Sequence, residues 1–159
     1  MNQESGKLEA VHLYWALGMI QAMHSIEEVA GHLPDTMHLV STRLLTIVGL
    51  KGFSMSYDAF AMGNLVIVAL FLGSVPLLMN DGRKGLFFMA GVAIVECLNG
   101  LLHLGGSAVL GHYVPGALTA PFLLVFGGLT LVKVVGQLRQ TTQSPKPTSL
   151  QAQEQISRP

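Results

Sequence analysis

The sequence predicts an all-α protein, a polytopic membrane four-helix bundle with an additional amphipathic interfacial helix. Half of its 159 residues are hydrophobic and only 11% are charged, whereas soluble domains carry about 25% charged residues. Asp, Glu, Lys and Arg are missing from residues 59–80 and again from residues 97–132. Because about 20 apolar residues are enough to cross the hydrocarbon of a bilayer, both stretches can form membrane spans.

Four spans are expected within a single transmembrane domain that covers residues 1–139. They are predominantly apolar and cover about residues 8–29, 59–79, 85–110 and 116–135. Pro115 is suited to begin the fourth span, because a helix needs no N–H donor at its first position. The tail at residues 140–159 is rich in Gln, Ser, Thr and Pro and is expected to be disordered.

A further helix is expected between the first two spans. Residues 37–50 are mostly apolar but carry His38 and Arg43 and are short for a span, which favours an amphipathic helix in the membrane interface. The alternative is a full span that carries Arg43. Asp35 follows a helix break at residues 31–34 and is a candidate N-cap.

The distribution of basic residues predicts the orientation. With four spans, both termini lie on one side of the membrane, and that side holds most of the Lys and Arg residues: Lys7, Arg83, Lys84, Arg139, Lys146 and Arg158. The positive-inside rule then places both termini in the cytoplasm, most simply in a plasma (inner) membrane. Glu4 and Glu9 flank Lys7 where a signal peptide would be basic, so the first segment is expected to be retained.

Composition also limits the partners. The formal net charge is zero, so no general attraction to nucleic acid is expected and the lipid bilayer is the main partner. The single cysteine, Cys97, excludes an intrachain disulfide.

A group of ionisable residues ends the first span, at His24-Ser25-Ile26-Glu27-Glu28. Such groups cost several kcal/mol to bury beside hydrocarbon unless a partner, a proton or a metal ion compensates them. On a helix, Glu27 and Glu28 lie three and four residues after His24, so the three side chains are expected to share one side.

The third span carries a second polar stripe, made by Glu96, Asn99 and His103. The first and third spans run in the same direction. His24 and His103 lie roughly 24 Å and 27 Å along them, at 1.5 Å per residue. The two stripes are therefore expected at similar depth and facing each other, with Asn64 of the second span able to join them.

These motifs resemble the HXXEE-domain family of predicted integral membrane proteins, which has an H-x-x-E-E motif, a further histidine and a Y-x-P-G motif. His24, Glu27 and Glu28 match the first motif. His103 matches the further histidine, with His112 as the alternative. Tyr113, Pro115 and Gly116 match the last motif. The resemblance covers roughly residues 10–135 and implies a site but no reaction.

Three functions remain open from the residues. The first is a membrane-embedded enzyme in which His24, Glu28 and His103 bind zinc or iron, with a lipidic or amphiphilic substrate. Glu27 or Glu96 is then a further ligand or the general acid/base. The second is a non-enzymatic protein in which the polar cluster specifies helix pairing. The third is a relay that moves protons.

Overall fold

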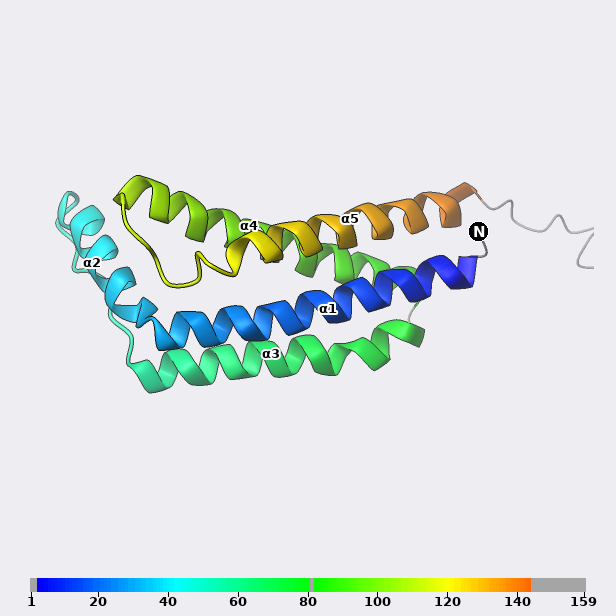
Figure 1. The fold of residues 1–159 in the computed structure, drawn as a ribbon, viewed down its shortest axis with the longest axis horizontal. Coiled ribbons are helices and arrows are strands. Elements are labelled where there is room, and N and C mark those ends of the chain that lie inside the picture. Colours follow the sequence, from blue (N-terminus) through cyan, green and yellow to red (C-terminus); the bar gives the residue numbers. More distant parts are fainter. Residues whose placement is uncertain (1–2, 81, 144–159) are drawn as a thin grey trace, which may run out of the picture.

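The computed structural model describes residues 3–80 and 82–143, and this part of the chain is helical with short connections. The helices are α1 (Gln3–Ala30), α2 (Leu33–Thr46), α3 (Tyr57–Asn80), α4 (Gly82–Leu110) and α5 (Ala120–Gln143). Four long helices lie side by side, and α2 sits at the end of the bundle opposite the N-terminus (Figure 1). The predicted all-α membrane bundle with one additional short helix is confirmed.

Three helices are long and apolar enough to cross a membrane. The candidate spans are Tyr57–Met79, Gly82–Leu110 and Ala120–Gln140. Helix α1 has 28 residues, which is sufficient length, but its polar residues keep it out of this group. The fourth span therefore stays a prediction.

Several boundaries differ from those predicted. The short helix begins at Leu33 and not at residue 37, since Pro34 lies in its first turn, where proline is well tolerated. Asp35 lies inside that first turn, and the N-cap is His32, which makes no side-chain cap hydrogen bond. Helix α5 begins at Ala120, four residues later than predicted. It reaches Gln143, so residues 140–143 are helical, and the rest of the predicted tail lies outside the described residues.

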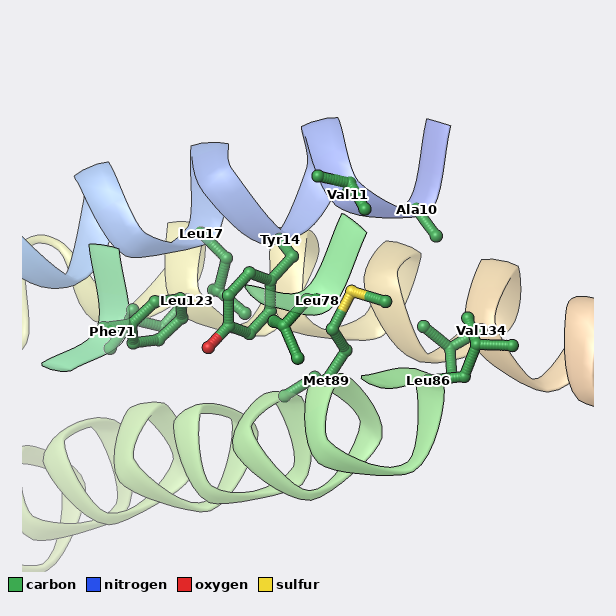
Figure 2. Packing of buried hydrophobic residues seen from close by; sticks show 11 residues of the cluster. Ala10, Val11, Tyr14, Leu17, Phe71, Leu78, Leu86, Met89, Leu123 and Val134 are labelled. Atoms are coloured by element: carbon green, nitrogen blue, oxygen red, sulfur yellow. The ribbon is translucent and has the colours of Figure 1, made fainter. Parts of the chain in front are cut away.

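One half of the bundle holds a dense hydrophobic core. Side chains from α1, α3, α4 and α5 meet there, as Figure 2 shows. Tyr14 lies at its centre, with its ring stacked on Phe71 at 4.6 Å and its hydroxyl 2.9 Å from the Ser74 hydroxyl. Close packing of these large side chains provides many van der Waals contacts between the four helices, and such contacts favour helix association in a membrane.

Small residues allow α4 and α5 to approach closely. A Cβ atom on Gly100 would lie 2.9 Å from the backbone oxygen of Ala120, and one on Gly127 would lie 3.2 Å from that of Ala93. Close backbone approach at small residues is a common way for helices to associate in membranes, where burial from water contributes little.

This contact gives a first prediction. Gly100→Ala should lower the free energy of unfolding by about 1–3 kcal/mol, because the added methyl meets backbone that cannot move aside. Gly91→Ala on the same helix is the matched control, since a Cβ there meets nothing within 4 Å. Thermal unfolding of the detergent-purified variants measures both. Equal midpoints for the two variants would contradict this account of the α4–α5 contact.

Candidate functional site

Two histidines and a carboxylate from α1 and α4 meet inside the bundle. The Oε1 atom of Glu28 lies 3.3 Å from Nε2 of His24 and 3.0 Å from Nε2 of His103. The imidazole rings are 4.6 Å apart and nearly perpendicular. All three residues are buried, and one potential ligand atom from each lies within 4.8 Å of the others. The stripes of the two helices thus face each other.

Glu27 faces a different partner, the turn that connects α4 to α5. Its Oε1 atom accepts hydrogen bonds from the Tyr113 hydroxyl at 2.5 Å, the Gly116 N–H at 3.0 Å and the Leu118 N–H at 2.9 Å. Its Oε2 atom accepts from the N–H and the hydroxyl of Thr119, at 2.9 Å and 2.6 Å. Both oxygens are therefore occupied. Glu27 does not join the cluster, in contrast to the expectation that it shares the side of His24 and Glu28.

This turn passes over the end of α1 (Figure 1) and explains the Tyr-x-Pro-Gly motif. Gly116 has a φ of +97°, and a Cβ there would lie 2.5 Å from Nδ1 of His103 and 2.8 Å from Cε1 of His24. Only glycine fits this backbone conformation and this close approach. Pro115 packs on Gly31, where a Cβ would come within 2.6 Å of the proline ring. Pro115 therefore packs the turn against α1 and does not begin α5.

Thr119 connects Glu27 to His24 and determines the tautomer of the imidazole. The Thr119 hydroxyl donates its single hydrogen to Oε2 of Glu27, and the distance between Oγ1 and Oε2 is 2.6 Å. The 2.7 Å contact of Oγ1 with Nδ1 of His24 must then be donated by the histidine. We therefore assign the proton of a neutral His24 to Nδ1, which leaves an unprotonated Nε2 directed at Glu28.

That Nε2 atom is buried, and it forms no hydrogen bond with any described residue. The nearby Oε1 atom of Glu28 also carries lone pairs, so the two acceptors repel each other. Only a cation between them, or a proton on either Nε2 or the Glu28 carboxylate, turns the 3.3 Å contact into an attraction. The Nδ1 atom of His103 is likewise buried without a partner in the described chain.

A row of hydrogen-bonded polar side chains, Gln21, Ser25 and Asn64, extends the polar region toward α3. Nε2 of Gln21 donates to the Ser25 hydroxyl at 3.2 Å, and that hydroxyl donates to Oδ1 of Asn64 at 2.7 Å. Nδ2 of Asn64 donates to the Phe60 carbonyl at 3.4 Å. Asn64 of α3 is therefore hydrogen-bonded to α1 through Ser25.

A cavity of about 1240 Å³ opens beside the cluster, between α3 and α4 and next to α2. Glu28, Glu96, Asn99 and His103 line its polar side. Most of the remaining lining is apolar. Glu96 is buried, and its Oε2 atom has no partner among the described residues.

The other histidines lie away from the cluster. His12 and His112 are exposed, His32 contacts the Tyr57 ring, and His38 contacts the Phe53 carbonyl. The histidine that meets His24 is thus His103, and not the alternative His112.

Sequence reasoning missed Thr119, Gln21 and Ser25. Gln21 and Ser25 carried a usable signal, since they lie three before and one after His24 in an apolar helix. Thr119 carried none, because a threonine at the start of an apolar segment is common and its role depends on the turn.

Comparison with known proteins supplies a family and no activity. A family model described as "Protein of unknown function with HXXEE motif" matches residues 15–131. Neither the curated proteins nor the solved structures contain a match to the chain.

The interactions of Glu27 give the second prediction. Glu27→Gln should lower the free energy of unfolding by about 2–3 kcal/mol. The NH₂ group of the glutamine would face N–H or O–H donors of the α4–α5 connection, so hydrogen bonds would be lost. Tyr113→Phe removes one bond only and should cost about 1 kcal/mol. Denaturant unfolding in detergent compares the two variants with the parent protein. A Glu27→Gln variant as stable as Tyr113→Phe would refute the central role of this carboxylate.

The phenol of Tyr113 gives the third prediction. Its hydrogen bond to Glu27 raises the pKa of Tyr113 from 10.0 to about 12. Since the folded pKa is the higher one, this bond stabilises the protein fully below pH 10, and its contribution is lost as the pH rises through about 12.

The titration of Tyr113 is measured by absorbance near 295 nm. Subtracting the absorbance of Tyr113→Phe from that of the parent protein isolates this one phenol. The Glu27→Gln variant should return the pKa toward its ordinary value. A folded parent protein whose Tyr113 titrates near pH 10 would show that the bond is not formed.

Proposed function

The chain belongs to the family of proteins of unknown function with an HXXEE motif, and from this premise we propose that it is a membrane-embedded, metal-dependent enzyme. In this proposal His24, Glu28 and His103 hold one divalent ion. The adjoining cavity receives a lipidic or amphiphilic substrate.

The observation that carries the proposal is the buried Nε2 of His24, which has no hydrogen-bond partner among the described residues and lies 3.3 Å from Oε1 of Glu28. Thr119 and Glu27 hold the proton of the imidazole on Nδ1, the tautomer that a metal ligand at Nε2 requires. Metal-binding histidines typically donate their other N–H to a polar partner, which orients the ring and raises its basicity. The Thr119 hydroxyl supplies that partner at 2.7 Å.

The donor set suits zinc or non-haem iron. Two imidazoles and one carboxylate are the protein ligands of several catalytic zinc sites and of the facial triad that binds Fe(II). Both leave positions open for substrate, and a divalent ion there acts as a Lewis acid toward a substrate oxygen. Ligands from two separate helices also require the folded bundle, so metal affinity and folding are coupled.

The cavity supports an apolar substrate with a polar reacting group. Its polar side is formed by Glu28 and His103 of the cluster together with Glu96 and Asn99, and its other walls carry mainly aliphatic and aromatic side chains. Glu96 lies beside the cluster but outside the group of potential ligands. We assign it the role of general acid/base, because a carboxyl group there can exchange a proton with a bound substrate.

We further propose that α1 is the fourth span. Its polar residues Gln21, His24, Ser25 and Glu28 are buried within the bundle. Large apolar side chains are exposed on its outer face: Leu8, Trp15, Met19, Met23 and Ile26. Ile26 is 69% exposed, and contact with lipid would remove such a surface from water. With four crossings, the positive-inside rule supports cytoplasmic termini, and we propose that the cavity lies in the outer half of a plasma membrane.

A second function is favoured by one further observation. Hydrogen bonds and close contacts link the exposed Tyr113 through Glu27, Thr119 and His24 to the buried Glu28. In this alternative a proton, and not a metal ion, occupies Nε2 of His24, and the chain relays protons.

Metal analysis of the detergent-purified protein tests the proposal and is the fourth prediction. Near-stoichiometric zinc or iron is expected, and His24→Ala and His103→Ala should each lose it. Thr119→Val should lower metal affinity by about 10- to 100-fold, while Thr119→Ser retains it, since only the hydroxyl orients His24.

Tyr113→Phe is the matched control, because it weakens the same turn without touching His24. It should therefore lower stability but keep metal affinity. A parent protein that binds neither metal after loading would overturn the enzyme proposal. Proton flux into liposomes that is lost in Glu96→Gln would then support the relay.

A further inference from the structure

Two buried hydrogen-bond acceptors in the wall of the cavity have no donor. Oε1 of Gln21 and Oε2 of Glu96 lack partners among the described residues. Both residues line the cavity, and they are 3% and 5% exposed, respectively. A buried acceptor without a donor costs about 1–3 kcal/mol, so this pair indicates a ligand that supplies donors.

The orientation of the Gln21 amide follows from its neighbours. The Phe60 carbonyl can only accept, so Asn64 must direct its NH₂ group there and its oxygen toward Ser25. Ser25 then donates to Asn64, which requires Gln21 to offer its NH₂ group to Ser25. Oε1 of Gln21 remains as the end of this row of bonds. The wall therefore presents an acceptor, and not a donor, at this point.

Glu96 presents a carboxyl group that no basic side chain compensates. Among the described residues that line the cavity there is no lysine or arginine. The ion proposed at His24, Glu28 and His103 would offset the charge of Glu28, and Glu96 lies outside that group. A buried carboxylate either takes up a proton or is compensated by a cationic or donor partner, and the cavity that Glu96 lines gives access to such a partner.

The rest of the cavity fits a hydrocarbon chain. Its apolar lining comes from three helices and a loop: Leu33, Val40, Leu44, Phe53, Ile67 and Leu102. The volume of about 1240 Å³ exceeds the roughly 300–1,000 Å³ of ordinary small-molecule sites. The walls are thus suited to a long aliphatic tail next to a small polar end.

We propose that this cavity binds a single-chain amphiphile whose head group is a protonated amine. The ammonium group donates to Oε2 of Glu96 and to Oε1 of Gln21, and the chain lies along the apolar wall. This inference rests on the proposed function in one respect, because it names the class of substrate that the same site would bind. Ammonium is preferred to a hydroxyl group because it supplies both several donors and the missing positive charge.

Three probes with equal tails test the proposal: dodecylamine, dodecanol and dodecanoate. Binding to the full chain is measured by native mass spectrometry, once after chelator treatment and once after zinc loading. Dodecylamine should bind at least about tenfold more tightly than the other two, as expected for a charge-assisted hydrogen bond. Equal or tighter binding of dodecanol or dodecanoate would overturn the assignment.

Variants separate the head-group contact from partitioning into detergent. Glu96→Gln should lower dodecylamine affinity by about tenfold or more and leave dodecanol affinity unchanged. Gln21→Leu should lower the dodecylamine affinity by a smaller factor, because this substitution removes a neutral acceptor. Asp58→Asn is the matched control, because it removes one exposed negative charge outside the cavity lining. Equal losses in Glu96→Gln and Asp58→Asn would refute the proposed contact.

Metal content measured on the same samples keeps the two proposals apart. Selective amine binding without metal would overturn the metal-dependent function and support the amine site. Bound metal without amine selectivity would support the metal function and overturn the amine site.

Discussion

The arrangement of the site depends on one carboxylate, Glu27, and the turn that surrounds it. The N–H groups before a helix have no partners within the helix and need acceptors. Glu27 supplies them for the start of α5, where the helix dipole also favours a negative charge. It accepts from three backbone N–H groups and two hydroxyls. This interaction connects α1 to α5 and brings the Gly116 backbone against both imidazoles.

The two consecutive glutamates of the motif then have a simple geometric explanation. Successive side chains on a helix point about 100° apart, so neighbouring carboxylates can face different partners. Glu27 faces the turn, and Glu28 faces His24 and His103. His24 lies one helical turn earlier and meets both systems, through Thr119 on one ring nitrogen and Glu28 on the other. The motif therefore joins a structural clamp to a buried cluster.

The sequence was informative where a pattern depends on one helix. Charge-free stretches predicted α3, α4 and α5, and the helical spacing of His24, Glu96 and His103 predicted two facing stripes. It was less informative where a boundary depends on tertiary contacts. The start of α5 was predicted too early, because the turn at Gly116 is stabilised by Glu27 from a distant helix. Thr119 was missed for the same reason, since its importance follows only from contacts 92 and 95 residues away.

Along its length the bundle has a densely packed apolar half and a half with a polar interior. Around Tyr14 the four long helices fill their interior mainly with large apolar side chains. Around His24 the interior is polar, and α3 and α4 are separated by a cavity. Polar groups without partners lower stability, so a bundle that served only to pack would bury apolar residues there as well. Because the dense half is closely packed, the bundle can tolerate acceptors and an imidazole nitrogen in the other half that have no partners among the described residues.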